Sequence, residues 1–337
     1  NALGAFNGTK SQPMTQDERL IARVHFVNRL LKANSQSFQQ LFWAVMRAKH
    51  NQEFVEVRPQ GSLGDGGNDG YLPADGHYFQ VYGPVDPEDK VTVAADKLAD
   101  DFDKLKATWS ATTSIRAYSF VFNDKYEGTF LKIAQALGAI EKANPSVTCR
   151  PFTAGHLEDA FLSLPVDRIQ NILGMVLPDP AKIVRVDYGV LKEVIAHIMT
   201  SPSNSVLTRF GELPELGEKI KLNNLCSAWG DLIRNRARQS GHVDTYFAKN
   251  STFTKQALRD HLVELYQRVR DAGRALTTIP SGINREDLIF DDFRRAVLPD
   301  NATVAMQDAV EILIGYYFEA CDIFDPHAEK GLPNASP

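Results

Sequence analysis

The sequence has few cysteines and no long apolar run, and both shortages exclude classes of protein. Its three cysteines, Cys149, Cys226 and Cys321, lie far apart, so neither a metal-binding cysteine pair nor a disulfide framework is expected. The longest apolar stretch, residues 309–318, is interrupted by Glu311 and is shorter than the roughly 20 residues of a membrane-spanning helix. The first residues carry no basic segment followed by an apolar core, so no signal peptide is predicted. These absences predict a cytoplasmic protein with reduced thiols and no membrane partner.

The chain also lacks a large excess of charge of either sign. Its 37 basic and 42 acidic residues give a net charge of −5 over 337 residues. A surface that binds polyanions over its whole extent is therefore not expected, although a local basic patch can still form. Arg234, Arg236 and Arg238 form one such cluster on a predicted helix. They are candidate contacts for nucleic acid or a protein partner, or else part of a solvated helix face.

Apolar spacing divides the chain into an α/β half and a helical half. In the first half, helical and strand patterns alternate, and a hairpin pattern occupies residues 54–82. Strands separated by helices pair in parallel and the hairpin adds antiparallel strands, so we expect a mixed sheet flanked by helices. From about residue 180 the pattern is almost purely helical. We predict an α/β domain over residues 18–178 and an all-α assembly domain over residues 184–325, whose apolar helices favour a homo-oligomer.

The individual elements follow from the same patterns. Residues 20–50 form two helices separated at Asn34-Ser35. The other predicted helices cover residues 89–108, 129–143, 156–164, 188–200, 214–222, 224–240, 243–247, 254–271 and 303–324. The predicted strands cover residues 54–58, 71–72, 78–82, 115–122 and 147–150.

The most unusual stretch is the glycine-rich segment 61–70, which leads into the predicted hairpin. Five of its ten residues are glycine, which permits backbone angles closed to other residues and close approach of a ligand. Asp69 directly precedes one hairpin strand and Gln80 lies midway along the next, so both side chains can converge on one divalent cation such as Mg²⁺. Such a cation would activate water and stabilise a phosphoryl transition state. The alternative is a plain turn, because Gly-Asn-Asp-Gly is common turn chemistry.

These motifs also resemble those of a known family. Residues 64–71, followed by Tyr-Phe-Gln-Val-Tyr-Gly-Pro at residues 78–84, are similar to the effector proteins of bacterial ABC-three-component systems. More broadly, the helix, strand and Asp-Gly-Tyr hairpin resemble the PD-(D/E)xK restriction-endonuclease-like core. The resemblance implies a nuclease-like N-terminal domain and a helical C-terminal domain. It further implies a Mg²⁺-dependent DNA endonuclease that acts against phages or plasmids with an ABC-type ATPase and a small middle component.

The resemblance assigns part of a catalytic site. Asp69 matches the metal-binding aspartate, and Gln80 matches the (D/E) position, where Mrr-like relatives carry glutamine. Tyr82 stands where the nuclease core has its lysine, two residues after Gln80. The resemblance therefore leaves the role of that lysine to Lys97, or to Lys90, of the next helix.

The first helix of the nuclease core often carries a glutamate, but residues 39–40 are both glutamine here. Glu56, or Glu53, would take its place as a metal ligand. Three hypotheses stay open at this point. The chain is an active metal-dependent endonuclease, a degenerate nuclease fold that senses nucleic acid or assembles a complex, or an unrelated enzyme such as a hydrolase on an α/β scaffold.

Overall fold

The chain forms two compact units. One, the α/β unit, contains residues 26–174, and the other, the helical unit, contains residues 15–25 and the described residues from 175 onward. The division falls within helix α1 (Gln16–Lys32). The computed structural model describes residues 14–59, 65–111, 114–201, 215–320 and 323–324.

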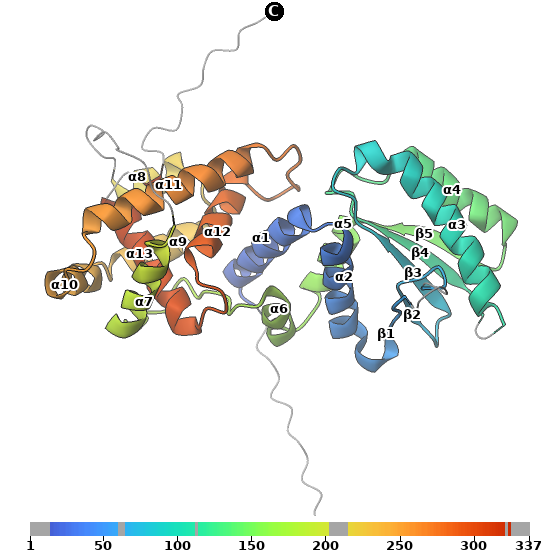
Figure 1. Cartoon of the computed structure of the whole chain (residues 1–337), viewed down its shortest axis with the longest axis horizontal. Helices are drawn as coiled ribbons and strands as arrows, with labels where there is room; N and C mark the ends of the chain where they lie inside the picture. The colour runs from blue at the N-terminus through green and yellow to red at the C-terminus, as the bar shows by residue number, and fades with distance from the viewer. Residues whose placement is uncertain (1–13, 60–64, 112–113, 202–214, 321–322, 325–337) are drawn as a thin grey trace, which may run out of the picture. The chain divides into compact units, whose positions relative to one another are not determined.

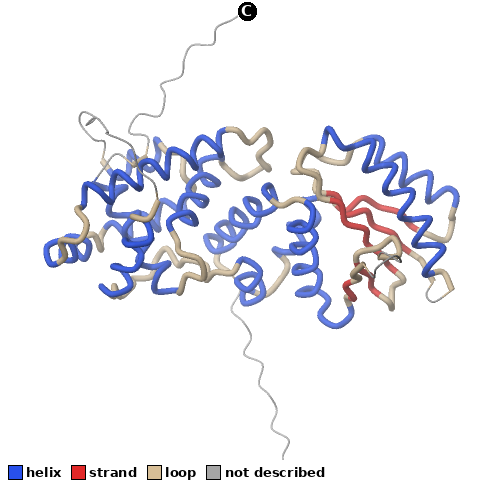
Figure 2. The backbone as a smooth tube through the Cα atoms, viewed as in Figure 1, coloured by secondary structure: helices blue, strands red, loops and turns tan. Residues whose placement is uncertain are grey.

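A five-stranded mixed sheet forms the centre of the α/β unit, as Figures 1 and 2 show. Strands β1 (Val55–Glu56), β2 (Gly70–Leu72) and β3 (His77–Tyr82) pair in antiparallel fashion. Strands β4 (Ala117–Phe122) and β5 (Thr148–Phe152) continue the sheet in parallel, in the spatial order β1-β2-β3-β4-β5. A helix connects each parallel pair, because parallel neighbours need a crossover connection. The predicted mixed sheet is confirmed.

Helices cover both faces of this sheet (Figure 1). On one face, α3 (Val91–Trp109) and α4 (Leu131–Ala143) enclose a cluster of buried aromatic and aliphatic side chains. On the other face, α2 (Ser35–His50) packs through Phe42, whose ring centroid lies 5.6 Å from that of Phe79 on β3. Successive residues of β3 therefore face different helices, since side chains alternate along a strand.

The α/β unit ends with α5 (Ala154–Leu162) and α6 (Val166–Leu173), of which α6 was not predicted. Helix α6 follows Pro165 and ends at Gly174, which has a φ of 72° and forms a left-handed C-cap. The helix has only eight residues and buries only Ile169 and Leu173, so it contains too few apolar positions to show a helical period.

The helical unit confirms the predicted helical half, with one addition. Helix α12 was missed because its buried residues include Asp287, Asp291 and Arg294, which interrupt the apolar period. Among the described residues, no helix has both the length and the apolar character needed to cross a membrane. Cys321 lies outside the described residues. The helix predicted over residues 303–324 also covers residues 321–322, which lie outside them. The remaining helices are α7 (Tyr188–Ile198), α8 (Leu216–Leu222), α9 (Ser227–Ala237), α10 (Gly241–Lys249), α11 (Lys255–Arg274), α12 (Arg285–Val297) and α13 (Val304–Ala320).

Candidate functional site

The described part of the glycine-rich segment packs against the backbone of α3. Gly66 and Gly67 have φ values of 65° and 82°, in the left-handed region that favours glycine. A Cβ atom on Gly67 would lie 2.1 Å from the carbonyl oxygen of Asp101 and 2.7 Å from the amide nitrogen of Leu105. Residues 61–64 of the segment lie outside the described residues. The described glycines therefore serve close packing, and the turn they form leads the chain into the interior.

Asp69 is buried at the end of this turn, with an exposed fraction of 4%. Its carboxylate accepts hydrogen bonds from the amide of Val81, at 2.7 Å, and from Nε2 of Gln39 on α2. Its backbone carbonyl accepts a hydrogen bond from Nε1 of Trp43 at 2.8 Å. Gln39 and Trp43 are one helical turn apart, so a single face of α2 holds both the side chain and the backbone of Asp69.

Gln80 lies on β3, the strand that adjoins Asp69. Gly70 pairs with Phe79, and the Asp69 amide donates to the carbonyl of that same Phe79 at 2.8 Å, so Asp69 adjoins the segment of β3 that carries Gln80. Gln80 has an exposed fraction of 1%, and its Oε1 atom has no hydrogen-bond partner among the described residues. A buried amide oxygen without a donor costs free energy, so this atom is suited to bind a ligand or an ordered water.

Lys97 approaches this hairpin from α3, where it forms an ion pair with Asp101 one helical turn further on. The second carboxylate oxygen of Asp101 lies 3.1 Å from Nζ of Lys104. Tyr78 packs into the cluster under α3 and α4, so the alternation of β3 places Gln80 on that same face. Helix α3 thus holds a half-buried lysine on the face of the sheet that carries Gln80.

The charge of Asp69 depends on these neighbours. Burial is the main cause that raises the pKa of Asp69, to about 7, and the carboxylates of Asp65 and Asp101 raise it further. The Val81 amide and the Lys97 ammonium lower it. Near neutral pH the carboxyl group therefore exists in both protonation states, and a cation at the site would favour the carboxylate.

Neither Tyr82, which occupies the position of the usual lysine, nor Lys90 acts on Asp69. The ring of Tyr82 stacks on Phe122, with centroids 6.1 Å apart and an interplanar angle of 17°, so it belongs to an aromatic row on β3 and β4. Lys90 is exposed at the end of the turn η3 (Glu88–Lys90). Of the three positions, Lys97 is the lysine that acts electrostatically on Asp69.

The two glutamates considered as metal ligands have other surroundings. Glu56 Oε1 lies 3.2 Å from Nε of Arg47 on α2, and β1 touches Asp69 through the backbone, where the Val57 amide donates to the Asp69 carbonyl. Glu53 is exposed in the turn η1 (Asn51–Glu53). Among the candidates, Lys97 acts electrostatically on Asp69, Gln80 lies on the strand that adjoins Asp69, and Glu56 has a different partner, Arg47.

Asp69 and Gln80 carry oxygen donors of the chemical class that Mg²⁺ prefers, and such an ion would take most of its ligands from water and substrate. Asp69 offers a carboxylate whose oxygens each retain a lone pair, and Gln80 offers the unpartnered Oε1. Proteins commonly bind Mg²⁺ through one or two carboxylates, together with waters and phosphate oxygens. In the described parts of the chain, no group of three or more His, Cys, Asp or Glu side chains is arranged to hold a metal. The donor set therefore suits a weakly held ion.

Sequence reasoning missed two contacts of this site, those of Gln39 and Trp43 with Asp69. It considered Gln39 only as the place of an absent glutamate, whereas the Gln39 amide contacts the Asp69 carboxylate. The spacing of four residues between Gln39 and Trp43 was the available indication that both share one helix face.

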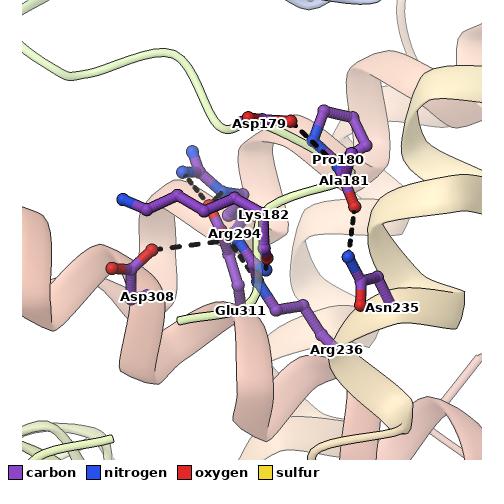
Figure 3. A network of polar contacts seen from close by, with 9 residues as sticks. All are labelled: Asp179, Pro180, Ala181, Lys182, Asn235, Arg236, Arg294, Asp308 and Glu311. Atoms are coloured by element: carbon purple, nitrogen blue, oxygen red, sulfur yellow. Dashed lines mark hydrogen bonds and ion pairs between the residues drawn. The ribbon is translucent and has the colours of Figure 1, made fainter. Parts of the chain in front are cut away.

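The arginine cluster of α9 divides between the interior and the surface of the helical unit. Arg236 has an exposed fraction of 1% and binds Oε2 of Glu311 through Nε, at 3.2 Å, and Nη2, at 3.0 Å (Figure 3). Arg294 binds the other oxygen of Glu311 through Nε and Nη2, at 3.1 and 2.6 Å. A guanidinium enclosed in this way cannot contact a phosphate, so the prediction that Arg236 contacts nucleic acid is corrected to an interior role.

The other two arginines of the cluster remain on the surface. Nη1 of Arg234 lies 2.7 Å from a carboxylate oxygen of Asp231, and Arg238 is exposed. Between them, Asn235 donates to the carbonyl of Pro180 at 2.7 Å and fixes the segment that follows the α/β unit (Figure 3). Only Arg234 and Arg238 therefore stay available as partner contacts.

The helical unit, with its enclosed Arg-Glu-Arg group, coincides with a known type of domain. Residues 190–325 match the family model of C-terminal domain 10 of the ABC-three component (ABC-3C) systems. This match concerns the helical unit alone and supports its assignment to the C-terminal domains of ABC-3C systems. No curated protein and no solved structure matches the chain significantly. The hairpin with Asp69 lies outside the ABC-3C match.

Proposed function

We propose that the protein is the effector of an ABC-3C system and that its α/β unit is a restriction-endonuclease-like module that hydrolyses DNA with Mg²⁺. The buried Asp69 carboxylate beside the strand that carries Gln80, with Lys97 on helix α3 acting electrostatically on it, carries this proposal. An ABC-type ATPase and a small middle-component protein would license the activity, and the helical unit would mediate assembly, including self-association. The DNA of a phage or plasmid in the cytoplasm would be the substrate.

Each residue of the site has a defined task in this proposal. Asp69 would hold the cation through its carboxylate, and the amide oxygen of Gln80 would complete the ligand set or orient the attacking water. When bound, Mg²⁺ supplies Lewis-acid stabilisation of the phosphate and lowers the pKa of a bound water. The ammonium of Lys97 would balance the negative charge that develops on the phosphate.

Two further residues would position these groups. Gln39 holds one carboxylate oxygen of Asp69 and so sets the direction of the other lone pairs. Asp101 pairs with Lys97 and limits where its ammonium can reach. Glu56 would become a ligand only by leaving Arg47, so we assign it to the ion pair with Arg47.

A second candidate function has its own support. Tyr82 fills the position of the usual lysine with a stacked ring, and among the described residues no group of three or more His, Cys, Asp or Glu side chains is arranged to hold a metal. A module of this kind would bind nucleic acid or assemble the complex without cutting DNA.

The experiment that separates the two uses the full chain, alone and with its ATPase and middle component, incubated with DNA and Mg²⁺. We expect cleavage that Asp69→Asn abolishes. Asp65→Asn is the matched control: it makes the same chemical change at a turn residue whose carboxylate accepts from Gly67 at 2.9 Å, a role that asparagine can fill. Cleavage that survives Asp69→Asn would overturn the proposal, and DNA that is bound but never cut would favour the second candidate.

A further inference from the structure

A basic cavity lies at the C-terminal end of α2, on the helix that holds Asp69. It has a volume of about 750 Å³. Arg47 and Lys49 are exposed at its border, and Arg168 of α6 enters it from a different element. Its lining consists of Arg47, Lys49, His50, Asn51, Gln52, Glu53 and Arg168.

The side chains that line this cavity carry more positive than negative charge. Glu53 is the one acidic residue of the lining. Arg47 pairs with Glu56 at 3.2 Å, but 63% of its side chain stays exposed. Arg168 lies 3.9 Å from Asp167, a distance at the outer limit of an ion pair.

Lys49 and His50 also contribute to the charge of the cavity lining. Lys49 forms no ion pair with a described residue, so its charge is available to a ligand. Burial is the main cause that lowers the pKa of His50, and the neighbouring Lys49 lowers it further, while Glu53 and Asp75 raise it. In a chain whose net charge is −5, this concentration of cations is a local feature.

We propose that the basic cavity binds the phosphates of a nucleic-acid strand that passes Asp69. This inference rests on the proposed function and adds the part of the substrate that the α/β unit would grip. Arginine and lysine side chains on a folded surface are the groups that hold phosphates without reading bases. The cavity would therefore bind the strand through its phosphates, independently of the base sequence.

The geometry of α2 connects the cavity to the site. Gln39, Trp43 and Arg47 follow one another at four-residue spacing and share one face of the helix. At a rise of about 1.5 Å per residue, Arg47 lies about 12 Å along the axis from Gln39. Phosphates of one DNA strand follow one another at about 3.4 Å along the duplex, so this span corresponds to roughly three or four nucleotides. Arg58, whose guanidinium carbon lies 6.0 Å from the Trp43 ring centroid, adds a cation between the two ends.

The test measures binding of a labelled oligonucleotide, single-stranded or duplex, to the full chain in chelator, so that cleavage does not intervene. Lys49→Gln/Arg168→Gln is the variant. Lys142→Gln/Arg150→Gln is the matched control, because it also removes one exposed lysine and one exposed arginine of the α/β unit, away from the cavity.

We expect the cavity variant to bind at least roughly tenfold more weakly at low salt, and the slope of log K against log salt to fall by about 1.4 to 1.8. The control should keep the affinity and slope of the parent chain. Equal losses in both variants, or no binding by the parent chain at low salt, would overturn the proposal. Unchanged melting temperatures exclude misfolding, and the charge reversal Lys49→Glu alone should weaken binding further than Lys49→Gln.

The binding test of the cavity and the cleavage test of the proposed function can fail independently of each other. Asp69→Asn should bind the oligonucleotide at least as tightly as the parent chain, because it removes a negative charge. A chain that binds through the cavity and never cuts would contradict only the nuclease proposal. A chain that cuts DNA equally well without Lys49 and Arg168 would contradict only the cavity.

Discussion

One buried polar centre in the helical unit and one in the α/β unit differ in how their atoms are partnered. In the helical unit, both oxygens of Glu311 are occupied by the guanidinium groups of Arg236 and Arg294. In the α/β unit, the amide oxygen of Gln80 has no partner among the described residues, and burial raises the pKa of Asp69 to about 7. Buried polar groups in folded proteins are normally satisfied, and departures collect at functional sites.

This difference in partnering indicates a structural role for the Glu311 centre and a functional role for the hairpin with Asp69. The charged centre of the helical unit is complete within the unit, so its role is to hold helices α9, α12 and α13 in one arrangement. The hairpin of the α/β unit is complete only when something supplies the missing donors or charge. Binding a cation would do so, which is why we place the chemistry in the α/β unit.

The largest expected effect comes from breaking the complete centre. Glu311→Gln leaves two buried guanidinium groups facing a neutral amide and should destabilise the helical unit by about 3–5 kcal/mol. Urea denaturation followed by the fluorescence of buried Trp229 measures this loss. Replacing the whole group, as Arg236→Met/Arg294→Met/Glu311→Leu, should recover most of the stability. A cost below about 1 kcal/mol for Glu311→Gln would show that the centre does not hold the helices.

The next effect concerns the turn that delivers Asp69. Gly67→Ala adds a Cβ atom 2.1 Å from a backbone carbonyl at a φ of 82° and should destabilise the α/β unit by about 2–4 kcal/mol. Gly138→Ala is the control, because Gly138 lies in α4, where an added Cβ atom would meet no neighbour within 4 Å, and it should stabilise by about 0.5–1 kcal/mol. Thermal unfolding compares the two, and equal melting temperatures would contradict the packed turn.

A smaller effect should appear as a pH dependence of the α/β unit. The pKa of Asp69 is about 7 in the folded chain and 3.8 as the ordinary value, so the folded state retains a proton that the unfolded state releases between these limits. Stability should therefore fall as pH rises from about 4 to about 7. Asp69→Asn should remove this slope and stabilise the unit at pH 8 by roughly 1–3 kcal/mol without divalent cations. Urea midpoints at pH 5 and pH 8 that shift equally in both proteins would contradict the raised pKa.

The smallest effect belongs to the surface of α9. Arg234→Gln breaks an exposed ion pair with Asp231 and should cost no more than about 0.5 kcal/mol. Arg236→Gln, two residues on, should cost about 3 kcal/mol because it strands part of the Glu311 carboxylate. Similar melting temperatures for the two variants would contradict the division of the cluster between surface and interior.

Local patterns in the sequence predicted much of the α/β unit. The alternation of apolar residues and the Gly-Asn-Asp-Gly turn placed Asp69 before one strand and Gln80 on the next, because a hairpin brings near neighbours in sequence together. The parallel strands followed from the helices between them. These features depend on short spacings, which one sequence displays directly.

Contacts between residues far apart in the chain could not be predicted from local sequence patterns. Arg236 looks like a member of a surface cluster because its partner Glu311 lies 75 residues away. Helix α12 was missed because it buries charges that are neutralised only in the folded unit. The contact of Gln39 with Asp69 spans 30 residues, and only the packing of α2 on the sheet creates it.

The most direct test of the central claim is a crystal of the full chain soaked in Mn²⁺ at a pH above that at which Asp69 ionises, with the anomalous map calculated around the hairpin. The account predicts a metal bound by a carboxylate oxygen of Asp69 and the amide oxygen of Gln80, with Lys97 nearby. A map without a peak at Asp69, in a crystal where the hairpin is ordered, would contradict the assignment of metal-dependent chemistry to the α/β unit.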